Sequence, residues 1–237
     1  MPLIAKLIPR RNRTWTEIVI DGGDSLRLPN EHIPAGLAAG EPIAPELWAE
    51  LAAQSAYDLL YDKALRLLSR REHFVAELQR KLQAPSVSEA HVARVIGECK
   101  RMGYLDDRRA ATTFVAQLLG RGGIGRAKLR QELFTRGCPP ALAAEIVQAQ
   151  AGAIDEAGEV ARLLTGHRPQ FSSKLAQLRR KLAPAARSER ELAMQLRLRL
   201  SAAVAAYLAG RGFSGEDTRS AAVRFVQELL GDASDDA

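Results

Sequence analysis

The 237-residue sequence has few of the residues that mark metal-binding or disulfide-stabilised proteins. It contains only two cysteines, Cys99 and Cys138, which are too few for a disulfide framework. Its four histidines are scattered and form no pair at the i, i+4 spacing of a helical metal site. Both cysteines fall in segments with a helical pattern, where we expect small buried residues. The sequence therefore predicts no metal site and no cofactor.

Long apolar runs and aromatic residues are also scarce. No run approaches the about 20 apolar residues that a membrane-spanning helix needs. The opening stretch MPLIAKLIPRRNR is too short for a secretory signal, and its positive charges follow the apolar part. Aromatic residues make up 5% of the chain against 46% hydrophobic residues, so the cores should be aliphatic. We expect a soluble cytoplasmic monomer that does not contact membranes.

What the sequence does contain is a helical pattern that occurs three times. Each copy has an apolar residue, a second four positions later and a third five positions beyond that. The copies are Leu78/Leu82/Val87, Leu129/Leu133/Cys138 and Val204/Leu208/Phe213. Repeated units that bury their apolar faces by stacking form elongated arrays, which offer a surface rather than a pocket. The pattern favours a binding protein over an enzyme.

The N-terminal part differs from the rest. Alternation over 15–20, the turn sequence DGGD and extended residues at 25–28 predict a β-hairpin, with 4–8 as a candidate third strand. The fold class is mainly α: three tandem three-helix repeats in an elongated curved array, with a small N-terminal β-hairpin module. The predicted domains are the β module at 1–48, repeats at 55–104, 105–152 and 153–231, and a disordered acidic tail at 232–237.

The helical periodicity also predicts the elements inside each repeat. In the third repeat, a first helix near 153–164 precedes a basic insertion that includes 171–182. A second helix ends at Gly210, and a last one begins after Ser214. The helices expected in the first two repeats are 57–69, 73–82, 88–102, 107–119, 126–136 and 139–150.

Two apparent catalytic motifs have structural explanations. Residues 120–125 satisfy G-x-G-x-x-G, but a helix rather than a strand precedes them, so no dinucleotide site is predicted. We expect a flexible interhelical loop whose glycines let the backbone approach a partner, flanked by Arg121 and Arg126. Asp106 and Asp107 are adjacent, and adjacent residues of a helix point in different directions. They are expected to cap a helix rather than to act as an acid–base pair.

The basic residues are the remaining signal. The net charge is +6, and residues 162–211 hold 11 Lys and Arg against 2 Asp and Glu, a local charge of +9. This imbalance favours a polyanionic partner or an acidic protein surface over a merely solvated helix face. Contacts to DNA should reach phosphates, independently of sequence. The candidate partner-binding or DNA-binding residues are Arg70, Arg71, Lys81, Arg108, Arg109, Arg121, Arg126, Lys128, Arg130, Arg136, Arg179, Arg180 and Lys181.

Several segments together resemble the bacterial RecX regulatory family. They are ALRLLSRRE at 64–72, the GYLDD junction at 103–107, the glycine loop followed by a basic helix, and RGFS at 211–214. The resemblance covers most of residues 3–230 and is closest over 64–150. No single motif decides it, but the ordered set is fairly specific.

The resemblance implies a non-enzymatic modulator of RecA. Members of the family are three tandem three-helix repeats that bind the RecA–single-stranded-DNA filament and restrain its ATPase, recombinase and coprotease activities in DNA repair. Basic faces could then meet acidic RecA surface or DNA phosphate. Two other functions stay open from the residues alone. One is a stand-alone, sequence-independent DNA-binding protein of stacked three-helix units, and the other is a helical scaffold for a different partner.

Overall fold

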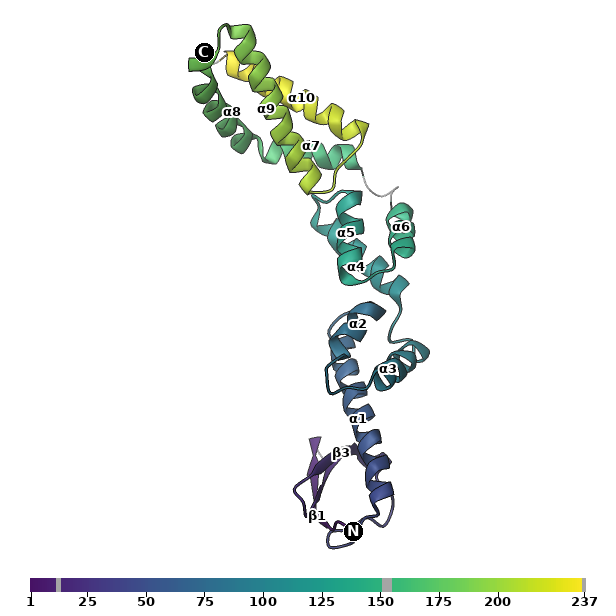
Figure 1. Ribbon diagram of the computed structural model, residues 1–237. Helices are drawn as coiled ribbons and strands as arrows, with labels where there is room; N and C mark the ends of the chain where they lie inside the picture. Colours follow the sequence, from purple (N-terminus) through teal and green to yellow (C-terminus); the bar gives the residue numbers. More distant parts are fainter. Residues whose placement is uncertain (12–13, 151–154, 236–237) are drawn as a thin grey trace. The chain divides into compact units, whose positions relative to one another are not determined.

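The structure of the protein, a computed structural model, describes residues 1–11, 14–150 and 155–235. The chain begins with three β-strands and continues with α-helices, ten of them in the described residues (Figure 1). The mainly helical fold class with a small N-terminal β module is therefore confirmed. The chain forms two units, Met1–Ala110 and Ala111–Ala237, and the division falls inside one helix.

The N-terminal strands form one antiparallel sheet in the order β1-β2-β3. They are β1 (Ile4–Arg10), β2 (Trp15–Ile20) and β3 (Ser25–Pro29), so the predicted hairpin is joined by the candidate third strand. Helix α1 (Pro45–Leu68) packs against β3. Ile4, Ile18 and Leu28 of the sheet are buried with Leu51 of α1, so the helix supplies the cover that a three-stranded sheet needs.

The first three helices differ from the expected ones mainly at the start of the first helix. Helix α1 is 24 residues long and begins 12 residues before the predicted start at position 57. Its N-terminal half faces the sheet and its C-terminal half packs against α2 (Val75–Leu82) and α3 (Glu89–Arg101). Ala64, Leu78 and Val95 are fully buried in the resulting core. Helix α1 begins early because its first turns pack against the apolar surface of the sheet. Helical periodicity in the sequence cannot predict this tertiary contact.

The next three helices are α4 (Asp107–Arg121), α5 (Arg126–Arg136) and α6 (Pro140–Ala149). Helix α5 ends in a Schellman motif at Gly137, which adopts φ 94°. The N–H of Cys138 donates to the carbonyl of Leu133 at 3.0 Å, closing the last turn. Because this turn buries Cys138, the third apolar residue of the repeat reaches the same core as Leu129 and Leu133.

The remaining helices are α7 (Glu156–Gly166), α8 (Arg168–Leu182), α9 (Glu189–Gly210) and α10 (Glu216–Asp235). The predicted basic insertion is helix α8, and its Phe171 and Leu175 are buried in one core with residues of α7, α9 and α10. The insertion is thus part of the packing. Helix α10 continues through 235, into the segment where a disordered tail is predicted, while the expected repeat boundary at 152–153 lies outside the described residues.

The threefold pattern corresponds to buried positions. Eight of its nine residues are buried, and Val87 is half-buried. The exception has a local cause. The second and third copies end in left-handed glycines, Gly137 and Gly212, whereas α2 ends at Gln83 in an extended conformation. Without the tight glycine turn, the chain after α2 leaves the helix axis and carries Val87 to the edge of its core.

Candidate partner-binding surfaces

In the first unit, two of the predicted binding residues already form ion pairs with a buried carboxylate. Glu77 of α2 is 9% exposed and accepts hydrogen bonds from the guanidinium of Arg71. The ammonium of Lys81 lies 3.2 Å from Glu77 Oε1 and 3.1 Å from the Nε2 atom of buried His73. Although burial alone would raise it, the hydrogen bonds from Arg71 and Lys81 lower the pKa of Glu77 to about 2. Through these contacts the two cations stabilise the first turns of α2.

Arg109 is likewise engaged within the first unit. Its guanidinium pairs with Glu72 at 2.8 Å and donates to the backbone oxygens of Gly103 and Tyr104. Those carbonyls lie in the turn after α3, where Gly103 adopts φ 73°. Arg109 therefore satisfies acceptors that a helix end leaves unpaired. Like Arg71, Arg109 links two segments of its own chain and so stabilises the fold.

The two adjacent aspartates cap two different helices. Asp106 Oδ1 accepts the backbone N–H groups of Arg108 and Arg109 at 2.8 and 3.0 Å, which is an N-cap of α4. These bonds lower the pKa of Asp106. Asp107 Oδ1 instead accepts the N–H of Val75 at 2.7 Å, at the first residue of α2. The capping role is confirmed for Asp106, and the structure adds a tertiary cap by Asp107 that adjacency alone does not predict.

Arg70 and Arg108 are the other two candidates of the first unit. Both side chains are exposed, Arg70 after the end of α1 and Arg108 in the first turn of α4. Arg70 has no side-chain partner among the residues that the structure describes. The thirteen predicted residues are thus carried by several different elements of the two units.

The glycine loop contacts another turn of its own chain. Gly125 N donates to the carbonyl of Arg211 at 2.8 Å, and Ala127 N donates to that of Gly212 at 3.2 Å. A Cβ atom on Gly125 would overlap the backbone of Gly212, and one on Gly212 would overlap Lys128. The expected close approach of the backbone is therefore present, but it joins α5 to the end of α9 rather than to a partner. Arg121 is exposed beside this contact.

Helix α5 carries four of the candidates, and their surroundings differ. Arg126 is half-buried beside Glu156, with 3.6 Å between Nε and Oε1. Lys128 pairs with Glu132, and the Arg136 guanidinium lies over the ring of Phe114 at 4.0 Å. Arg130 is exposed. Among the four, Arg130 is thus the one with the clearest access to a partner.

An exposed phenylalanine stands one turn beyond Arg130. Phe134 is 66% exposed, and it lies four residues after Arg130 on the face of α5 away from Leu129 and Leu133. Phe134 is not among the residues predicted from the sequence, because that prediction considered only the cationic residues of the helix. The signal was present: an aromatic residue off the apolar stripe of an amphipathic helix has no core to enter.

Helices α8 and α9 present a second surface of the same character. Arg179, Arg180 and Lys181 are exposed in the last turn of α8. On α9, Met194 and Leu198 are 69% and 71% exposed, one turn apart. No acidic residue occurs from Leu192 through Gly215. The sequence does not predict that these two large apolar side chains are exposed. Helical spacing alone does not show which face of an apolar helix packs against other helices.

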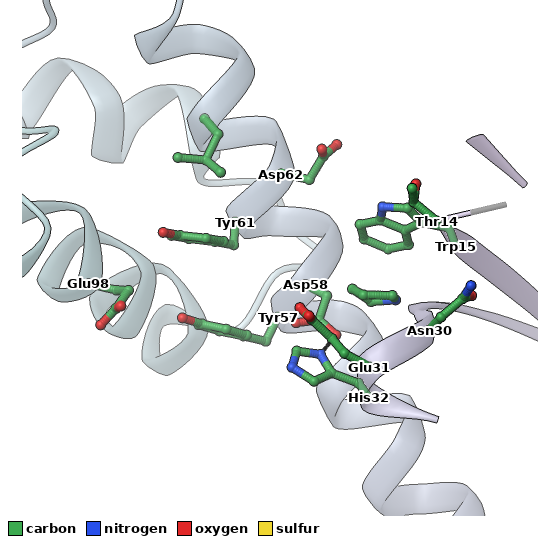
Figure 2. Close-up of a pocket in the computed structure, with 12 residues that line it drawn as sticks. Thr14, Trp15, Asn30, Glu31, His32, Tyr57, Asp58, Tyr61, Asp62 and Glu98 are labelled. Atoms are coloured by element: carbon green, nitrogen blue, oxygen red, sulfur yellow. Dashed lines mark hydrogen bonds and ion pairs between the residues drawn. The ribbon is translucent and has the colours of Figure 1, made fainter. Parts of the chain in front are cut away.

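The first unit contains an open cleft of about 800 Å³ between the β module, α1 and α3. Tyr57, Asp58, Tyr61 and Asp62 of α1 line it, and Figure 2 shows both tyrosine side chains extending toward α3. Trp15 of β2 faces the helix from the sheet. The sequence predicts a surface without pockets, and this aromatic cleft is a difference that arises where the β module meets α1.

Other classes of site are not found in the described part of the chain. No group of three His, Cys, Asp or Glu residues there could hold a metal ion. No helix within residues 1–11, 14–150 and 155–235 is long and apolar enough to cross a membrane. Both cysteines are buried, and burial raises the pKa of Cys99 to about 11, which keeps its thiol protonated near neutral pH.

The fold is a mainly helical one that exposes basic and apolar side chains on its helices, and comparisons with known proteins find similar chains. Residues 61–99 match the model of the first three-helix domain of RecX. The regulatory protein RecX of Escherichia coli O1:K1, and equally that of strain K12 / DH10B, is 40% identical over 92 residues. The match covers 35% of this chain and 55% of those proteins, so the chain spans about half the length of the curated relatives it matches.

A solved structure extends the likeness in fold. A crystal structure of regulatory protein RecX aligns with a TM-score of 0.55 and 17% identity, covering 96% of this chain and 100% of the other. At that identity the likeness concerns the fold alone. The chain is thus similar to RecX proteins in sequence over the first three-helix domain and its surroundings, and in fold over nearly its whole length.

Proposed function

We propose that this protein is a non-enzymatic regulator that binds the RecA–single-stranded-DNA filament. It modulates RecA ATPase, recombinase and coprotease activity in DNA repair, in the direction of inhibition. The support from comparison is the similarity to RecX proteins and their name "regulatory protein". The proposal also fits the exposed basic and apolar side chains on helices α5 and α9.

The observation that carries the proposal is the pairing of exposed arginines with exposed large apolar side chains in the second unit. Phe134 stands beside Arg130 on α5, and Met194 and Leu198 stand on the part of α9 that carries no acidic residue. Phosphate contacts use cationic and hydrogen-bonding groups, because the phosphate backbone offers no apolar surface. Apolar side chains beside cations suit a protein surface that carries carboxylates. A filament of protein on DNA supplies both kinds of contact.

The alternative is a stand-alone DNA-binding protein. It is favoured by the local charge of +9 over residues 162–211 and by the exposed cations at the end of α8. This function predicts tight binding to bare DNA with a steep decrease of affinity as salt rises. Phosphate contacts by themselves assign no role to Phe134, Met194 or Leu198, which is the physical ground for preferring the filament.

Co-sedimentation separates the two functions. The protein is mixed with RecA–single-stranded-DNA filaments and, in parallel, with the same DNA alone at matched salt. We expect recovery with the filament at concentrations that leave bare DNA unbound, and a lower DNA-dependent ATPase rate of RecA at substoichiometric protein. Equal recovery on bare DNA would favour the alternative, and an unchanged ATPase rate with no recovery would refute both.

Charge and apolar contacts can be tested by matched variants. Arg130→Glu should weaken filament binding about tenfold, in line with loss of a charge-assisted contact. Phe134→Ala should weaken filament binding but leave any binding to bare DNA unchanged. Lys63→Glu changes the net charge by the same amount at an exposed position of α1 and serves as the control. An equal loss with Lys63→Glu would mean that total charge, not the α5 surface, governs binding.

A further inference from the structure

Helix α9 has two long faces, and the residues that the structure describes cover only one of them. Leu196 and Leu200 are buried on the covered face, in one core with residues of α7, α8 and α10. Figure 1 shows α8 and α10 lying beside α9. Met194 and Leu198 lie off that face and are 69% and 71% exposed. After Met1, they are the most exposed large apolar side chains in the described part of the chain.

The two exposed side chains belong to one apolar strip along α9. Residues four apart on a helix are neighbours, so Met194 and Leu198 lie next to each other. Ala202, the next position in this series, and Ala205 are exposed as well and extend the strip toward the end of the helix. Exposed apolar residues that occur singly are ordinary on a protein surface, whereas a contiguous group marks an interaction site.

Two arginines border this strip, one on each side. Arg197 and Arg199 directly precede and follow Leu198, and adjacent residues of a helix project about 100° apart. Both side chains are exposed, and neither forms a hydrogen bond or an ion pair with the residues that the structure describes. No acidic residue occurs from Leu192 through Gly215 to neutralise them. The strip is therefore apolar along its middle and positively charged on both edges.

This combination of features selects one kind of occupant. A second copy of the same face would bring arginines against arginines, and like charges across an interface are unfavourable. Helices that insert into a membrane surface use bulky apolar and aromatic side chains, whereas this strip continues into Ala202 and Ala205. A helix with an apolar stripe between carboxylates matches both the strip and its charged edges. The small alanine side chains also let such a helix approach closely.

We propose that the exposed face of α9 is the docking site for an acidic amphipathic helix of a partner protein. Apolar side chains of that helix pack on Met194, Leu198 and the alanines, and its carboxylates pair with Arg197 and Arg199. The inference rests on the proposed function in one respect, since it names the element that the regulated protein presents to α9. An isolated helix and a whole filament are separate ligands, so either proposal can fail alone.

Fluorescence anisotropy with designed peptides tests the site directly. The full-length protein is titrated into a labelled peptide of about 20 residues with leucines at the i, i+3, i+4, i+7 spacing and glutamates on both sides of them. One control peptide has the same composition in scrambled order, and the other has glutamine for each glutamate. We expect saturable binding of the first peptide and at least tenfold weaker binding of both controls. Equal binding of the scrambled peptide, or of the glutamine peptide, would overturn the proposal.

Two matched pairs of variants assign the binding to α9. Leu198→Ser should raise the dissociation constant of the acidic peptide about tenfold, and Arg197→Gln about fivefold, through loss of one apolar and one charge-assisted contact. Val223→Ser and Arg224→Gln make the same changes at exposed positions of α10 and should leave binding unchanged. All four variants should keep the circular dichroism spectrum of the parent chain. An unchanged dissociation constant with Leu198→Ser, or equal losses in the α10 variants, would contradict the assignment.

Two further measurements separate this inference from a membrane surface and from the proposed function. Sedimentation with phosphatidylglycerol vesicles should recover no protein, and recovery that Leu198→Ser abolishes would replace the partner helix by a membrane. Leu198→Ser should also weaken recovery with RecA–single-stranded-DNA filaments. Peptide binding by a chain that no filament recovers would refute the proposed function alone. Filament recovery without peptide binding would refute the α9 inference alone.

Discussion

The two units of this protein use charge in different ways. In the first unit, cations act as ties: Arg71 and Lys81 hold Glu77, and Arg109 joins Glu72 to the turn after α3. In the second unit, the contact between α5 and α9 is made by backbone, through Gly125 and Gly212. Exposed cations such as Arg130 are therefore left facing solvent.

The difference shows why a count of basic residues is a poor guide to a binding surface. Arg71 and Arg130 are both candidates by charge alone, the first between α1 and α2 and the second on α5. Arg71 pairs with the buried carboxylate of Glu77, whereas the side chain of Arg130 is exposed. An arginine that is already paired must break that pair before it can bind a partner, so the second unit is the better candidate for the regulatory contact.

The glycine contact should show the largest effect. Gly212→Ala places a Cβ against the backbone of Lys128 and forces alanine into a conformation with φ 83°, so unfolding free energy should fall by about 3 kcal/mol. Urea unfolding followed by circular dichroism measures this loss. Gly120→Ala, with no atom within 4 Å of the added Cβ, is the control and should be neutral or stabilising. Equal losses in both would contradict a packing role for Gly212.

The ionic tie of the first unit should show the next largest effect, and it should depend on pH. Because the pKa of Glu77 is lowered from 4.5 to about 2, its contribution is complete above pH 4.5 and disappears as the pH falls toward 2. At pH 7, Glu77→Gln should lower stability by about 2 kcal/mol. Fluorescence-detected unfolding measures it, since Trp15 and Trp48 both lie in this unit.

The acid series provides the internal check for that prediction. The stability difference between the parent chain and Glu77→Gln should shrink steadily between pH 4.5 and pH 2. A difference that stays constant over this range would mean that the loss at pH 7 comes from packing rather than from the ion pairs. Glu132→Gln, at the exposed pair with Lys128, should cost at most about 0.5 kcal/mol at any pH.

The smallest effect on stability is expected at the exposed face of α5. Arg130→Glu should change the unfolding free energy by no more than about 0.5 kcal/mol, because the side chain is exposed and away from the core. Thermal unfolding checks this. A large loss would show that Arg130 is a structural tie like Arg71, and the contrast between the two units would no longer hold.

Much of the fold follows from local sequence, and the site follows from it only in part. Periodic leucines predict α2 and α5 almost to the residue, and glycines after Arg136 and Arg211 predict the turns there. The α1 start at Pro45 was missed because its first turns depend on the sheet. Of the site, the sequence identifies the basic helices but not the exposed Phe134, nor which arginines are already paired.

The sequence by itself determined the helical class, the repeated apolar positions and the uneven charge, because these depend on spacing along one chain. Only the tertiary structure decided what each polar group contacts. It assigned Asp107 to the start of a distant helix, joined the glycine loop to the end of α9, and gathered Trp15, Tyr57 and Tyr61 around one cleft. These contacts link residues far apart in sequence, and periodicity carries no information about such pairs.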